Sequence, residues 1–200
     1  EIPLRLVGSE MCIRDRSNMI DYYEEQIGEN TKKYPLIRES IDYYIGLTEN
    51  AISYIVNTKN NIHKEISDTM VLSHNTLEKG LNDPENIILD HKARDVAEYI
   101  KWSFFNNNKN IFNELDEYFK YNYYSFYGIQ ILFGRVLYPS FYFNIYDKII
   151  SNKIDEKELN IIISKNKKYE RYLYDIYLYL SRYYALAVPE WIKKQGTNPR

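Results

Sequence analysis

The stretch from Pro84 to Lys101 constrains the fold most, because it places an apolar run, a polar turn and an Asp-led helix in one short segment. The apolar run, Asn86 to Leu89, is short and bounded by polar or helix-breaking residues, which favours a brief buried strand. Residues Asp90 to Arg94 then predict a turn. A helix that buries one face is expected from Asp95 onwards, because apolar residues follow at helical spacing.

Asp95 has two interpretations at this position. It can be a simple N-cap, whose carboxylate accepts backbone N–H groups of the first helical turn and complements the positive end of the helix dipole. It can also reach back and brace the upstream segment around Ser73 to Asn75. For a buried bond of this kind, Asp95→Ala is expected to cost about 1.5–3 kcal/mol.

The rest of the chain carries apolar residues at helical spacing almost throughout. A short helix is expected from Asn18 to Ile27, and a long one opens at Pro35 and ends before a polar loop from Asn57 to Asp68. Further helices are expected over 111–121 and in two long stretches beginning near Ser125 and Glu158. The predicted buried stripes are Ile37, Ile41, Tyr44, Ile45, Thr48, Ala51, Ile52, Ile55 and Val56; Ile129, Leu132, Phe133, Val136 and Leu137; and Leu159, Ile162, Ile163, Tyr169, Leu173, Ile176 and Leu180.

These stripes predict a mainly α fold in which the long helices pack with the Asp95 helix. The one expected strand pair is a short hairpin between about Met70 and Leu89. Pro139 is expected to kink the helix that contains it. Trp191 is expected to plug the core from a short terminal turn.

Composition excludes some classes of function. The 200 residues are 44% hydrophobic with a formal net charge of -2, which suits one domain and gives no basic excess for nucleic acid. Charged and amide residues interrupt the apolar runs before membrane-spanning length, so no transmembrane segment is expected. The 22 tyrosines are read first as codon bias with helix packing, and alternatively as an adhesive or cross-linkable surface.

The first sixteen residues resemble translated sequencing-adapter sequence and show no helical or strand periodicity. Residues 1–16 are therefore expected to be an artefactual or disordered tail, which implies that the native chain was cut on its N-terminal side. Excluding them removes Cys12, the single cysteine, and with it any disulfide or thiol site. Residues 17–195 are expected to form one helical domain, followed by a disordered tail over 196–200.

Several ordered blocks carry a resemblance to a known family: Tyr43 to Ile52 (YYIGLTENAI), Leu89 to Ile100 (LDHKARDVAEYI), Gly134 to Phe143 (GRVLYPSFYF) and Pro189 to Ile192 (PEWI). Together they resemble the YutH branch of CotS-type spore coat proteins. The resemblance implies the helical C-lobe of a protein-kinase-like fold, similar to aminoglycoside phosphotransferases and choline kinases. The small nucleotide-binding N-lobe would be missing from this chain.

The resemblance also assigns positions. Active relatives carry His-Gly-Asp, in which the Asp is the base, then an Asn and an Asp that hold the metal ions. Here His74 matches the histidine, Thr76 stands in place of the base, and Asn82 or Asn86 is the candidate metal-binding amide. Asp90 matches a turn Asp, and Asp95 matches the Asp that braces the catalytic loop.

The expected function is therefore an inactive, pseudokinase-like scaffold, because a threonine cannot deprotonate an alcohol and Mg²⁺ needs anionic oxygen ligands. Catalytic, cofactor and metal residues are expected to be absent, and His74, Asp90, Arg94 and Asp95 to be structural. His63 and His91 are expected to lie in solvent.

The resemblance alone implies an endospore coat-associated structural protein, made in the mother-cell cytoplasm and then located in the coat, with other coat proteins as partners. One alternative is a small-molecule phosphotransferase that uses Asp83 or Asp90. Another is a helical interaction module without kinase ancestry. An upstream lobe with a nucleotide-contacting lysine would separate these two.

Overall fold

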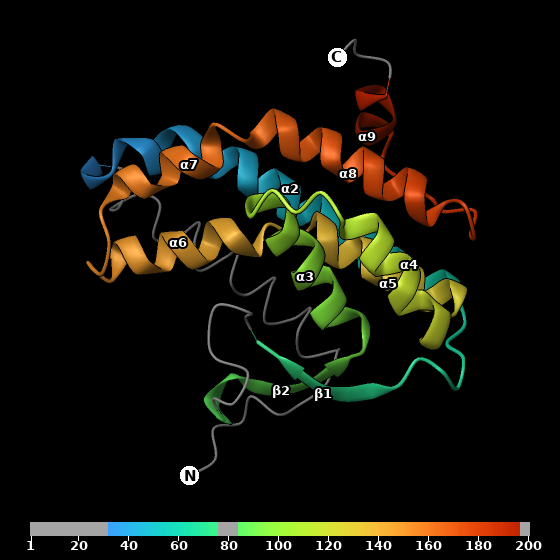
Figure 1. Ribbon diagram of the computed structural model, residues 1–200. Coiled ribbons are helices and arrows are strands. Elements are labelled where there is room, and N and C mark those ends of the chain that lie inside the picture. Colours follow the sequence, from blue (N-terminus) through green and yellow to red (C-terminus); the bar gives the residue numbers. More distant parts are fainter. Residues whose placement is uncertain (1–31, 76–83, 197–200) are drawn as a thin grey trace.

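The computed structural model describes residues 32–75 and 84–196 as a layered set of helices above one small hairpin (Figure 1). The expected helix over 18–27 lies outside these residues. The elements, in chain order, are α2 (Pro35–Asn61), β1 (Met70–His74), a 3-10 turn (Pro84–Asn86), β2 (Ile87–His91), α3 (Ala93–Phe105), α4 (Ile111–Tyr121), α5 (Phe126–Leu137), α6 (Ser140–Ile150), a second 3-10 turn (Glu156–Glu158), α7 (Leu159–Ile163), α8 (Asn166–Leu180) and α9 (Glu190–Gln195). The prediction of a mainly helical fold with one hairpin is confirmed.

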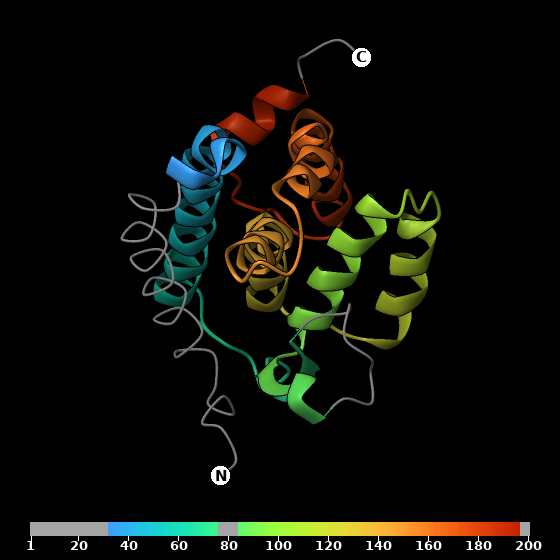
Figure 2. The same ribbon diagram turned by 90° about the vertical axis from the view of Figure 1, so that its left-hand side faces the viewer.

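Helix α5 is the centre of the core. It packs against both α2 and α3, and Figure 2 shows it lying between them. The residues from Tyr127 to Leu137 are all buried, as expected for a helix that is apolar on most sides. Ser125 caps its start, because its Oγ accepts the Gly128 N–H at 2.8 Å.

Helix α2 follows the predicted stripe but runs further than expected. Pro35 stands in its first turn, where the fixed φ suits a helix and no N–H is needed. The helix continues to Asn61, so the prediction of a loop from Asn57 is wrong. Buried Thr58 fits this last turn because its hydroxyl donates to the carbonyl of Tyr54 at 2.9 Å.

Two predicted long helices are each divided in the structure. Pro139 does not merely kink its helix: α5 ends at Leu137 and α6 begins at Ser140, because proline lacks the N–H that would continue the ladder. Helices α7 and α8 are separated at Ser164 and Lys165. No Pro or Gly marks that break. Beside it, the hydroxyl of Tyr44 donates to the side chain of Asn166 and ties the start of α8 to α2.

The C-terminal prediction is half right. A short helix, α9, does follow Pro189. However, Ile192 is fully buried, whereas Trp191 is only partly buried at the edge of the core. Ile192 is therefore the residue that seals this end.

The hairpin is antiparallel, with Met70 paired to His91 and His74 paired to Ile87. Asp90 and His91 belong to strand β2, and α3 begins at Ala93. The predicted turn from Asp90 to Arg94 is thus wrong, and Asp95 lies in the first turn of α3 instead of leading it. A side-chain bond explains the early start: Nδ1 of His91 accepts the Ala93 N–H at 3.1 Å.

Candidate functional site at the hairpin and helix α3

Asp95 turns back from α3 to the end of β1, as expected. Its Oδ1 accepts the backbone N–H of His74 at 2.9 Å, and its Oδ2 lies 3.1 Å from Nδ1 of the His74 ring. The two side chains are 36% and 25% exposed. Asp95 therefore fixes both the main chain and the imidazole of His74, while its negative charge complements the N-terminus of α3.

Arg94 holds the same segment by donating hydrogen bonds to the carbonyl groups of His74 and Asn75. Its Nε donates to the carbonyl of His74 at 2.9 Å, and one terminal nitrogen donates to the carbonyl and the side-chain oxygen of Asn75 at 3.1 and 2.9 Å. The other terminal nitrogen donates to Asp90 at 2.8 Å. A planar guanidinium with several donors suits this task.

Asp90 is the buried centre of the network. Its residue exposure is 0%, and its two carboxylate oxygens are bonded to Arg94 and, from α5, to Arg135. It also accepts the His91 N–H at 2.7 Å. Burial alone would raise the pKa of Asp90, but Arg135 and Arg94 outweigh it and hold the pKa below its ordinary value. A divalent cation could reach this carboxylate only by displacing an arginine.

His91 is buried, so the prediction that it lies in solvent is wrong. Its Nδ1 serves the start of α3, and its Nε2 lies 3.6 Å from Oδ1 of Asp68, whose side chain is buried. Burial and the nearby charge of Arg135 lower the pKa of His91 to about 4. The ring is therefore neutral at pH 7. His63 is exposed, as expected.

The other predicted positions divide into two groups. Asn86 is buried, and its carbonyl accepts the Asn75 N–H at 2.7 Å, which extends the hairpin. Thr76, Asn82 and Asp83 lie outside the described residues. Within residues 32–75 and 84–196, no group of three His, Cys, Asp or Glu side chains could hold a metal ion.

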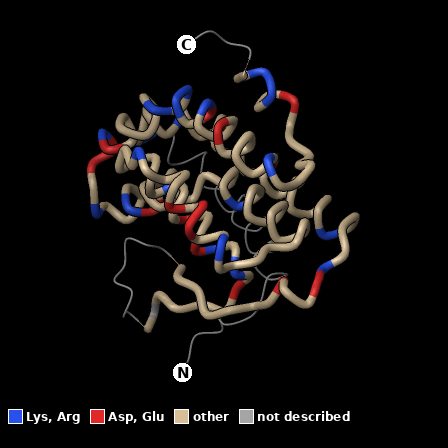
Figure 3. Tube along the Cα trace, turned by 45° about the vertical axis from the view of Figure 1, so that its right-hand side comes forward, with Lys and Arg blue, Asp and Glu red and all other residues tan. Residues whose placement is uncertain are grey.

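Sequence reasoning missed Arg135 and Asp68. Arg135 is a lone charge in the apolar helix α5, and a buried charge nearly always has a partner. That signal could have identified it. Figure 3 shows the acidic and basic residues that lie close together where α3 meets the hairpin. The arrangement is charge-paired and fixes the backbone of residues 74–75.

The fold and the site define a mainly helical protein in which a buried ion-pair network holds one hairpin against the core. The chain belongs to the YutH family of spore coat proteins, because residues 16–176 match the family described as "Spore coat putative kinase YutH". It is similar to the endospore coat-associated protein YutH of Bacillus subtilis (strain 168), with 30% identity over 180 residues.

That match covers 80% of this chain and 53% of the Bacillus protein, so the chain spans about half the length of this curated relative. No solved structure matches the chain. Among the described residues, no helix is both long enough and apolar enough to cross a membrane.

Proposed function

We propose that this chain is the helical lobe of a structural protein associated with the endospore coat, and that this lobe has a kinase-like ancestry without phosphotransfer activity. The coat role is supported by the family and by the name of the Bacillus relative. In this proposal the protein is made in the mother-cell cytoplasm, joins other coat proteins and uses no nucleotide or metal cofactor.

One observation carries the proposal of inactivity. The phosphotransferase alternative would use Asp83 or Asp90. Asp83 lies outside the described residues, and the oxygens of Asp90 are bonded to two arginines at full burial. Phosphoryl transfer needs Mg²⁺ on the phosphates and anionic ligands to hold it. We propose instead that His74, Asp90, Arg94 and Asp95 serve the structure of the hairpin.

The test uses the full-length family protein, because this chain spans about half of its relative. We expect no saturable Mg-ATP binding and no phosphate transfer to a panel of small alcohols, including choline and an aminoglycoside. Thr76→Asp should not restore turnover, since it supplies a base without a metal ligand. Transfer of phosphate to any of these alcohols would instead establish the phosphotransferase alternative.

A second measurement addresses the coat role separately. A fluorescent fusion of the full-length protein should form a ring around the developing spore from the mother-cell side. Diffuse fluorescence throughout sporulation would contradict the coat assignment, whatever the activity assay shows.

A further inference from the structure

A groove of about 650 Å³ lies between α4 and the end of α8, lined in part by the segment that leads into α5. We call it the α4–α8 groove. Its apolar lining comes from Phe119, Tyr124, Ile129 and Leu180. This volume lies within the range of pockets that bind small molecules. No residue of the network around Asp90 lines the groove.

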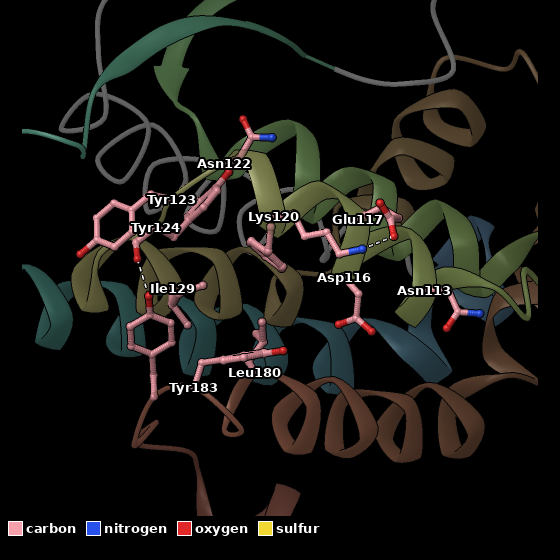
Figure 4. Close-up of a pocket in the computed structure, with 12 residues that line it drawn as sticks. Asn113, Asp116, Glu117, Lys120, Asn122, Tyr123, Tyr124, Ile129, Leu180 and Tyr183 are labelled. Carbon is pink, nitrogen blue, oxygen red and sulfur yellow. Dashed lines mark hydrogen bonds and ion pairs between the residues drawn. The ribbon is translucent and has the colours of Figure 1, made fainter.

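Asp116 is one of five residues with an amide or charged side chain in the lining of this groove. Figure 4 shows its side chain pointing from α4 towards α8. Oδ1 accepts the hydroxyl of Tyr179 at 2.8 Å. Burial and this carboxylate raise the pKa of Tyr179, so the phenol stays protonated and donates. The second oxygen, Oδ2, makes no hydrogen bond to any residue in the described ranges.

Two cations lie nearby, and one of them, Lys120, lines the groove itself. Lys120 is paired with Glu117 on the same helix, and the guanidinium of Arg182 lies over the Tyr179 ring, 5.4 Å from its centroid. Neither forms an ion pair with Asp116 within the described part of the chain. Lys120 still interacts electrostatically with Asp116. The charged lining of the groove is Asp116, Glu117 and Lys120, which is net negative and lies next to apolar surface.

Two exposed aromatic rings border the groove. Tyr123 and Tyr183 are 61% and 66% exposed, and Tyr123 donates its hydroxyl to Glu65 at 3.1 Å. Aromatic faces attract ammonium groups, and an aliphatic stem packs well on apolar walls while its charged end meets a carboxylate.

We infer that the α4–α8 groove is a docking site for a lysine side chain, flanked by apolar residues, from a partner protein. The ammonium group pairs with Oδ2 of Asp116, and the stem lies along Phe119 and Leu180. This choice rests on charge complementarity. The inference rests on the proposed coat role only for the location of the partner protein, which would be the spore coat.

The experiment uses the 200-residue chain and three probes, followed by ¹H–¹⁵N chemical shifts of the groove. The probes are acetyl-Leu-Lys-Leu-amide, the same peptide with norleucine for lysine, and n-butylammonium. The lysine peptide should bind about tenfold more tightly than the norleucine peptide, as one charge-assisted hydrogen bond predicts. It should also bind more tightly than n-butylammonium, which lacks the flanking residues.

Asp116→Asn should abolish the preference for lysine, while its amide oxygen can still accept the Tyr179 hydroxyl. Asp175→Asn is the matched control, since it removes the same charge from α8 at a partly exposed surface pair with Arg171, and it should keep the preference. Equal binding of both peptides, or no shifts in the groove, would overturn the inference.

Two further outcomes would also reject a partner protein. Binding of n-butylammonium as tight as the lysine peptide would make the groove a small-amine site. A concentration-dependent increase in mass through this groove would make the occupant a second copy. The kinase assay tests the scaffold and the peptides test the groove, so either can fail alone.

Discussion

Asp90 and Asp95 are near neighbours in sequence but lie in different electrostatic environments. Asp90 is fully buried between two guanidinium groups, whereas Asp95 is 36% exposed at the start of α3. Removing one partner of a buried ion pair leaves an uncompensated charge. A half-exposed carboxylate is partly replaced by water when it is lost.

We therefore expect Asp90→Ala to lower the free energy of unfolding by about 3–5 kcal/mol. Asp95→Ala should lower it by about 1 kcal/mol, less than the cost expected for a buried bond, because water screens the site. Urea titrations of both variants would measure this order. Equal costs would mean that Asp90 is not the centre of the network.

His91 predicts a pH dependence. Its pKa is lowered from 6.5 to about 4 in the folded chain, so the unfolded chain takes up its proton first as the pH falls. The contribution of His91 to the free energy of unfolding is fully present above about pH 6.5. It is lost as the pH falls from about 6.5 to 4, by up to about 1.4 kcal/mol per pH unit. The pKa of Asp90 is lowered from 3.8, so its contribution is lost below that window.

His91→Asn keeps an acceptor for the Ala93 N–H and should flatten the pH dependence between 6.5 and 4. Urea midpoints at pH 7, 5.5 and 4.5 would measure it, with His63→Asn as a control for the loss of a histidine at an exposed position. An unchanged slope in His91→Asn would assign the pH dependence to another group.

At this scale, local partners were predictable from sequence and distant ones were not. Asp95 could be placed because its helical position and the resemblance both indicated a bond to residues 73–75. Arg135 lies 45 positions from Asp90, and no local pattern joins them. His91 was misjudged because the strand was expected to end at Leu89, which left the histidine in a turn.

At the scale of elements, the close approach of α2 and α5 has a specific cause. A Cβ added at Gly134 would lie 2.5 Å from Cγ1 of Ile55, so only glycine lets the two helices meet at this distance. Gly46, on α2, has no neighbouring atom within 4 Å of an added Cβ. Gly46 and Gly134 therefore offer a matched comparison between an open and a crowded helical glycine.

Gly134→Ala should destabilise the protein by about 1–3 kcal/mol through overpacking. Gly46→Ala should stabilise it by about 0.5–1 kcal/mol, because alanine has the higher helix propensity and nothing obstructs it. Thermal unfolding followed by circular dichroism would measure both. A stabilising Gly134→Ala would show that α2 and α5 can separate at little cost.

Apolar spacing predicted which segments are helices, but tertiary contacts decided where helices end. Helix α4 matches its prediction because the asparagines before it break the chain and Asn110 precedes its first turn. The division of α7 from α8 lacks such a signal. The early start of α3 depends on one histidine side chain that accepts a backbone N–H.

At the scale of the whole molecule, the outer face of the hairpin is apolar and open. Leu72 is 70% exposed and Ile87 is 37% exposed, and a two-stranded sheet is marginally stable without further packing. We propose that segments of the longer relative that have no counterpart in this chain pack against this face.

Hydrogen exchange provides the test. Amides of Met70–His74 and Ile87–His91 should exchange at least about tenfold more slowly in the full-length protein than in this chain, because added packing raises the local opening free energy. Amides of α5 serve as the internal control, since that helix is already buried. Equal exchange at the hairpin would contradict the contact.

The link between Asp90 and Arg135 also bears on the order in which the chain folds. Burying the carboxylate of Asp90 is costly until the guanidinium of Arg135 on α5 is next to it. Bringing these two groups together closes the chain between them into a loop, and loop closure costs entropy. The helices can gather around α5 before this contact exists. We expect the hairpin to settle on the core late, so that refolding rates depend little on Asp90 while unfolding rates depend on it strongly.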